Sequence, residues 1–218
     1  VKARARVLQE TTYDGCLKVS KSFENELKRH PAGYSLVATQ YGLSVAYAKM
    51  NQKDKALTAI RAAKAASKEN SVILDKHLAE LTYQVAKTQA QKDQALALAK
   101  STCNQYPYSG LAASNYVELL FQSGKHQELV DYLRNQSALS RSNPDYHMYL
   151  ARSYEALGKK SMAFAATGDM YALLDNPRAA VYQFELAQKA NDGDFYIMSE
   201  IDAKLREQRQ KVLDQKKD

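Results

Sequence analysis

The pattern Thr167-Gly168-x-x-Tyr171, followed by Ala180-x-x-x-Phe184-x-x-Ala187, decides the fold expected for this 218-residue chain. Spacings of three and four residues place these side chains on one face of each of two successive helices. The small residues let the two helices approach closely, and Asn176-Pro177 marks the end of one helix and the start of the next. This stretch therefore predicts two antiparallel helices joined by a short turn.

Related patterns occur four more times upstream, two of them in looser form. They are Leu43-Ser44-x-x-Tyr47 with Ala56-x-x-x-Ile60-x-x-Ala63, Tyr83-x-x-Ala86 with Ala95-x-x-x-Ala99, Tyr116-Val117-x-x-Leu120 with Leu129-x-x-x-Leu133, and Leu150-Ala151-x-x-Tyr154 with Gly158 and Ala163. A single match is also typical of an ordinary amphipathic helix pair, but five in tandem indicate repeats of the tetratricopeptide (TPR) type. We therefore expect an all-α chain, a right-handed α-solenoid of tandem antiparallel helix pairs with about ten or eleven helices.

Turn signals separate the expected helices. They are His30-Pro31-Ala32-Gly33, Tyr106-Pro107, Ser123-Gly124, Asn143-Pro144, Leu157-Gly158, Asn176-Pro177 and Asp192-Gly193. Because no interior linker interrupts the pattern, we expect one TPR-like domain over residues 1–218, with residues 194–218 as a C-terminal capping helix. The chain begins with Val1 rather than Met, so we expect a fragment in which residues 1–12 form the junction with a missing upstream domain.

Composition and charge exclude several classes of protein. Hydrophobic residues make up 45% and charged residues 25% of the chain, which excludes a disordered protein, and no apolar stretch is long enough to span a membrane. The net charge of +7 would suit an anionic partner, but the charges alternate in sign, as in Lys53-Asp54-Lys55. Cys16 and Cys103 lie about two repeats apart in this scheme, so we predict two buried thiols that form no disulfide.

Catalytic and metal-binding patterns are absent from the sequence. Of the four histidines, only His77 in His77-x-x-Glu80 approximates a zinc-protease helix, and it has no second histidine within one turn. Two ligands without a third would not hold zinc tightly. We therefore predict no catalytic residue, no metal site and no cofactor in this chain, with His77 as a surface or groove residue.

The C-terminal third of the chain carries a longer resemblance. Its motifs are the segment from Tyr149 to Gly158, the segment from Asp169 to Leu174, and the closing string Asp194-Phe195-Tyr196, Ser199 and Ile201-Asp202-Ala203-Lys204-Leu205-Arg206-Glu207. Over residues 145–209 the sequence resembles the C-terminal TPR region of periplasmic M48-type zinc metallopeptidases of the BepA/YfgC-like group, and over residues 1–144 it is compatible with that region.

This resemblance implies a bacterial periplasmic protein that takes part in outer-membrane protein assembly and quality control. Its repeats would recruit unfolded or outer-membrane proteins or the assembly machinery, and they would also adjoin the protein's own protease domain. Zinc would be bound only in that upstream domain, because the His-Glu-x-x-His signature is absent from this chain.

Helix spacing also indicates where a partner would bind. A solenoid has a surface lined mainly by the first helix of each pair, and the free side of those helices supplies a candidate peptide-binding groove. The principal candidates are Tyr41, Val45, His77, Leu111, Phe121, Met148 and Arg152, joined by Glu80, Gln84, Ser114, Glu118 and Glu155. With Arg152 as the only cation, this set disfavours a clamp for a terminal carboxylate and favours extended apolar segments, unless several of these residues are buried against neighbouring repeats.

Three functions from different classes remain open at this stage. The first is a protein–protein interaction module, the docking region of an envelope metallopeptidase. The second is a free-standing TPR adaptor protein. The third is a helical-repeat binder of nucleic acid, suggested by the charge of +7 and fifteen tyrosines, although we expect protein or peptide partners rather than nucleic acid.

Overall fold

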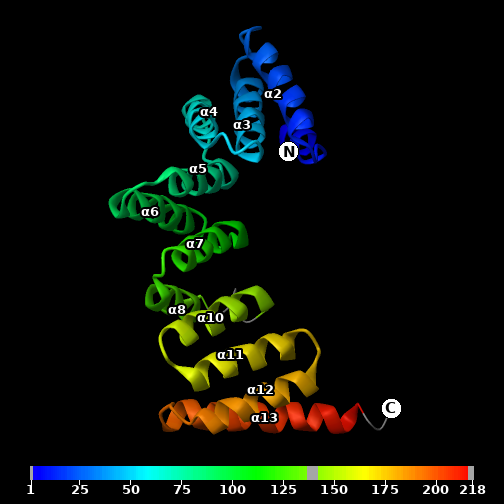
Figure 1. The fold of residues 1–218 in the computed structure, drawn as a ribbon, viewed down its shortest axis with the longest axis vertical. Coiled ribbons are helices and arrows are strands. Elements are labelled where there is room, and N and C mark those ends of the chain that lie inside the picture. Colours follow the sequence, from blue (N-terminus) through cyan, green and yellow to red (C-terminus); the bar gives the residue numbers. More distant parts are fainter. Residues whose placement is uncertain (1, 137–141, 216–218) are drawn as a thin grey trace. The chain divides into compact units, whose positions relative to one another are not determined.

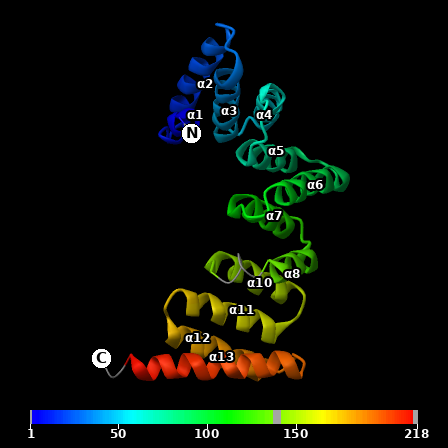
Figure 2. The same ribbon diagram turned by 180° about the vertical axis from the view of Figure 1, so that it is seen from behind.

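The computed structural model describes residues 2–136 and 142–215, and all regular structure in this part of the chain is helical. Contacts divide the chain into two compact units, Val1–Leu119 and Leu120–Asp218 (Figures 1 and 2). The prediction of an all-α chain built from successive helix pairs is confirmed. The prediction of one domain with a junction at residues 1–12 is not tested by these observations and stays a prediction.

Six helices and most of a seventh form unit 1. Their bounds are α1 (Lys2–Leu8), α2 (Tyr13–Leu27), α3 (Gly33–Lys49), α4 (Lys53–Ala66), α5 (Val72–Val85), α6 (Gln89–Gln105) and α7 (Gly110–Gln122). Each helix from α2 to α5 packs against the next in sequence, and α1 packs on α3. The core of the unit contains the fully buried Val7, Phe23 and Ile60.

Unit 2 takes the end of α7 and the remaining helices. These are α8 (His126–Asn135), α10 (Pro144–Ala156), α11 (Lys160–Leu173), α12 (Pro177–Ala190) and α13 (Phe195–Asp214). Figure 1 shows α10 to α13 as successive antiparallel helices. Phe184, Ile201 and Leu205, each at most 2% exposed, lie in the core between α12 and α13.

The described residues thus form twelve helices, where the sequence predicted ten or eleven. One helix that the prediction did not include is α1, which lies in the segment assigned to a junction. Seven residues are too few to show a helical period, and a helix this short depends on tertiary packing. Here the packing comes from Val7, which is fully buried, and from Lys49 Nζ on α3, which donates to the Glu10 carbonyl at 2.7 Å.

Side-chain caps fix the helix starts that the sequence indicated. Asn143 accepts a hydrogen bond from the Asp145 amide at 3.0 Å, and Asn176 accepts one from the Ala179 amide at 3.1 Å, in each case with proline at the first turn. Asp192, after α12, accepts hydrogen bonds from the amides of Lys160 and Ser161, both at 2.7 Å. The Ser161 side chain, and after it these backbone bonds, lower the pKa of the Asp192 carboxyl.

Two glycines allow unusually close helix contacts. A Cβ atom on Gly42 of α3 would lie 2.5 Å from the ring of Phe23 on α2. A Cβ atom on Gly168 of α11 would lie 2.8 Å from the ring of Phe184 on α12. Both rings are 1% exposed, so each fills the space that its glycine leaves open. Gly168 and Phe184 both belong to the opening sequence pattern, in which small residues were expected to let the two helices approach closely.

Candidate functional site

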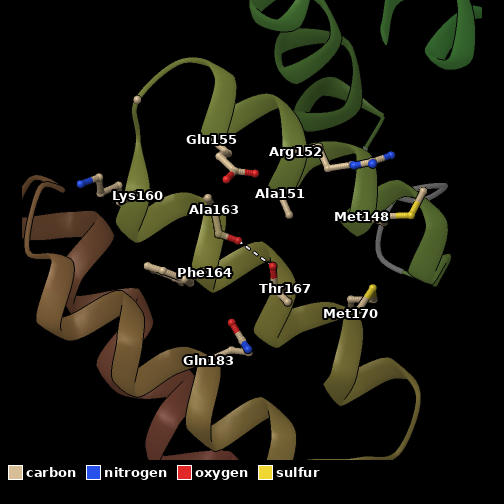
Figure 3. Close-up of a pocket in the computed structure, with 11 residues that line it drawn as sticks. Met148, Ala151, Arg152, Glu155, Lys160, Ala163, Phe164, Thr167, Met170 and Gln183 are labelled. Carbon is tan, nitrogen blue, oxygen red and sulfur yellow. Dashed lines mark hydrogen bonds between the residues drawn. The ribbon is translucent and has the colours of Figure 1, made fainter. Parts of the chain in front are cut away.

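A groove in unit 2 lies along α10 and α11, beside Gln183 of α12 (Figure 3). It has a volume of about 420 Å³, within the range of ligand pockets. The residues that line it are Met148, Ala151, Arg152, Glu155, Gly158, Lys160, Ala163, Phe164, Thr167, Met170 and Gln183. We call this the α10–α11 groove.

Helix periodicity explains how the chain builds this surface. Met148, Arg152 and Glu155 follow one another at intervals of four and three residues on α10, and Ala163, Thr167 and Met170 do so on α11. Thr167 Oγ1 donates to the Ala163 carbonyl at 3.0 Å, so this hydroxyl is already satisfied within the helix (Figure 3). The surface that remains is largely apolar.

Arg152 is held in place by an aromatic cluster next to the groove. Its guanidinium lies 5.5 Å from the ring centre of Phe121, a contact of cation–π type. The Phe121 ring in turn meets Tyr149 edge-on at 5.3 Å and His126 at 5.5 Å. Among the described residues no carboxylate forms an ion pair with Arg152, so its charge is available at the edge of the groove.

The groove therefore combines an apolar surface with charge at its edges. Arg152, Glu155 and Lys160 are exposed, while Phe164 and Met170 are half-buried. Lys160 is a second cation that sequence reasoning missed, because its candidates came from α3, α5, α7 and α10 and none from α11 or α12. Phe164, Met170 and Gln183 were missed for the same reason. The helical spacing of α11 was the signal that could have placed Met170 on one face with Ala163 and Thr167.

Three candidates in unit 1, Tyr41, Val45 and His77, lie in a closed environment. Tyr41 and Val45 are each 9% exposed and belong to the hydrophobic core. Tyr41 meets the His77 ring edge-on at 5.7 Å, and His77 Nδ1 lies 3.7 Å from Glu80 Oε2. Their burial is the alternative that the sequence analysis left open, and packing accounts for Tyr41 and Val45.

Charges are compensated inside this closed cluster. Glu80 also forms an ion pair with Lys76 one turn away. Burial alone would raise the pKa of Glu80, but the contacts with His77 and Lys76 outweigh it and lower the pKa. His77 Nε2 is buried without a hydrogen-bond partner, so His77 is a partly buried packing residue rather than an open surface residue.

The remaining candidates are Gln84, Leu111, Ser114 and Glu118. Gln84 is exposed on α5. Leu111, which is 38% exposed, lies on α7 with Ser114 and Glu118. Of the seven principal candidates, the structure thus brings Tyr41 and His77 together in the closed cluster, and Phe121, Met148 and Arg152 together at the groove.

The side chains that could bind a metal do not cluster in the described residues. Nowhere in residues 2–136 or 142–215 do three or more His, Cys, Asp or Glu side chains converge as a metal site would require. Cys16 and Cys103 are buried, as predicted. None of the helices in these two ranges is both long enough and apolar enough to cross a membrane.

Known structures with a similar fold include a tetratricopeptide repeat protein. The chain is similar to "MamA AMB-1 C2221", with a TM-score of 0.53 and 18% identity over 79% of this chain and 94% of that one. It is similar to a tetratricopeptide repeat protein from Parabacteroides merdae, with a TM-score of 0.51 and 12% identity over 89% and 78% of the two chains. A chain of the APC/C hetero-tetramer Cut9-Hcn1 gives a TM-score of 0.51 and 12% identity over 88% of this chain and 39% of that one.

Sequence comparisons add no family to this result, since neither a protein-family model nor a curated protein matches the chain. At 12–18% identity the similar structures show the fold alone, a TPR-like solenoid of helix pairs.

Proposed function

We propose that the chain is a protein–protein interaction module that binds apolar polypeptide segments in the α10–α11 groove. The observation that carries the proposal is an open groove of about 420 Å³ in a TPR-like fold, lined by Met148, Phe164 and Met170. Methionine side chains adapt to apolar partners of varied shape, which suits a site for unfolded or extended chains. The proposal rests on this surface. Among the described residues, no group of three or more His, Cys, Asp or Glu side chains could hold a metal for catalysis.

A binding experiment on one substitution tests this function. The probe is a fluorescently labelled, reduced and carboxymethylated polypeptide, which exposes apolar segments without folding. Met148→Glu places a charge in the apolar groove, and we expect it to weaken binding about tenfold or more. Leu174→Glu is the matched control, because Leu174 is 56% exposed and does not line the groove. Equal binding by the wild-type protein and Met148→Glu would contradict the proposal.

We further propose a setting for the module, the repeat region of a periplasmic M48-type zinc metallopeptidase. The closing string from Asp194 to Glu207 supports it, and this string forms the start of α13, with Asp194 as the cap that accepts from the Ile197 amide at 2.9 Å. In this setting the module presents unfolded or outer-membrane proteins, or the assembly machinery, to a zinc-dependent protease domain.

The coding sequence upstream of Val1 provides the test of this setting. We expect a signal peptide followed by a His-Glu-x-x-His helix. If the protease domain is there, deletion of residues 1–218 should slow cleavage of unfolded substrates but not of short peptides. A complete reading frame without the signature would favour the free-standing TPR adaptor instead.

A further inference from the structure

The outer face of the α12–α13 hairpin carries exposed cations and apolar side chains together. We define this α12–α13 face by Arg178, Tyr182 and Lys189 on α12 and by Arg206 and Leu213 on α13. Tyr182 is 59% exposed and Leu213 is 52% exposed. The opposite side of α12 is covered within unit 2, because Phe184 packs against Gly168 of α11.

Two contacts between the helices place these residues on one surface. Arg209 of α13 forms an ion pair with Glu185 of α12 at 2.8 Å, and Gln188 donates to Asp202. Tyr182 lies three residues before Glu185, and Leu213 lies four residues after Arg209. Since the helices are antiparallel (Figure 1), the helical spacing places Tyr182 and Leu213 on the side marked by this ion pair.

The cations extend the same surface in both directions. Arg178 precedes Tyr182 by four residues and Lys189 follows it by seven, so all three share a stripe of α12. Arg206 precedes Arg209 by one turn on α13. No ion pair to Arg178, Lys189 or Arg206 is formed in residues 2–136 and 142–215, whereas the carboxylates of the face are engaged, Glu185 with Arg209 and Asp202 with Gln188. The face therefore has an excess of positive charge.

We propose that the α12–α13 face docks an acidic segment of a partner protein that also carries aromatic or aliphatic residues. Its uncompensated cations complement carboxylates, and Tyr182 and Leu213 complement apolar side chains. A nucleic acid fits less well, because Leu213 offers it nothing and the carboxylates of Glu185 and Asp202 lie within the face. This site is separate from the α10–α11 groove, none of whose lining residues belongs to it.

The test uses the full chain and three short fluorescein-labelled peptides. In the first peptide Asp and Glu alternate with Leu and Phe, and in the other two the acidic residues are replaced by Asn and Gln or by Lys. A labelled single-stranded DNA is the fourth probe. We expect the acidic peptide to bind best, and the triple variant Arg178→Glu, Lys189→Glu, Arg206→Glu to weaken it about tenfold or more.

Matched variants separate local recognition from net charge. The variant Lys18→Glu, Lys21→Glu, Lys87→Glu makes the same change in charge at exposed positions of unit 1, and it should alter the affinity by less than about twofold. Tyr182→Ser, which changes no charge, should weaken binding several-fold, and Tyr108→Ser, at a 94% exposed position of unit 1, should leave it unchanged. Circular dichroism checks that each variant is folded.

Three results would overturn the proposal. One is equal binding of the Asn/Gln peptide, which would mean that the carboxylates are not recognised. Another is an equal loss in the unit 1 variant, which would reduce the effect to net charge. The third is tighter binding of single-stranded DNA that the triple variant abolishes, which would assign the face to nucleic acid.

Discussion

The Tyr41–His77–Glu80 cluster of unit 1 and the α10–α11 groove of unit 2 arise from the same helical spacing but differ in exposure. Tyr41 and Val45 are buried, whereas Arg152 and Glu155 are exposed. In unit 1, α1 packs on α3 and the ring of His77 from α5 closes over Tyr41. On α10, small residues such as Ala151 leave an open surface. The spacing of residues thus determines which side chains share a helix face, whereas the neighbouring helices determine whether that face is buried.

This difference in exposure is tested most directly by truncating one residue in each of the two regions. Tyr41→Ala removes a buried aromatic ring and should lower the free energy of unfolding by about 3–5 kcal/mol. Arg152→Ala removes an exposed side chain and should change it by less than about 1 kcal/mol. Urea denaturation followed by circular dichroism measures both. Similar losses in the two variants would show that the clusters do not differ in the way described.

The two glycines that contact a buried ring, one in each unit, should respond to substitution in the same way, because neither contact has room for a larger side chain. Gly42→Ala and Gly168→Ala should each lower the free energy of unfolding by about 1–3 kcal/mol, since the added methyl group overlaps a buried ring. Gly110→Ala is the control, because its Cβ would meet nothing within 4 Å, and alanine is the better helix former. Thermal unfolding scans would contradict this account if all three variants were stabilised.

A smaller effect on stability is expected from the contact between Arg152 and Phe121 next to the α10–α11 groove. Arg152→Gln and Phe121→Leu should be coupled by about 0.5–1 kcal/mol in a double-mutant cycle of unfolding free energies, because the guanidinium lies over the ring. Additive effects of the two substitutions would mean that Phe121 does not hold Arg152 in place.

The smallest effect concerns pH in the closed cluster. Because the pKa of Glu80 is lower in the folded chain than in the unfolded one, its charged form stabilises the fold above pH 4.5, and this stabilisation is lost as the pH falls through the folded pKa. Glu80→Gln should therefore have a flatter stability profile below about pH 5 than the wild-type chain. Urea midpoints measured at several pH values test this, and parallel profiles would contradict it.

Much of the fold was predictable because its signals are local. The contact between Gly168 and Phe184, the caps at Asn143 and Asn176, and the turns at Gly158 and Gly124 each depend on a few neighbouring residues. The helix α1 was not predictable, because its stability comes from packing on α3 far along the sequence.

The candidate site was predictable only in part, for a related reason. Met148 and Arg152 follow from the spacing of α10, but Lys160 and Met170 enter the groove only because α11 turns back alongside it. The burial of Tyr41 depends in the same way on α1 and α5, which no local pattern could reveal.

The hydrogen bonds of Asp192 have one more consequence. They join the residue two positions after α12 to the first amides of α11, so the two ends of the helical hairpin formed by residues 160–192 are held together. Because these hydrogen bonds lie within one helical hairpin, a duplicated copy of residues 160–192 would keep them. The hairpin is therefore suited to extending the series of helices by duplication. Insertion of a second copy of residues 160–192 after Asp192 should therefore yield a soluble chain with proportionally more helical circular dichroism, whereas aggregation of that chain would show that the hairpin is not self-contained.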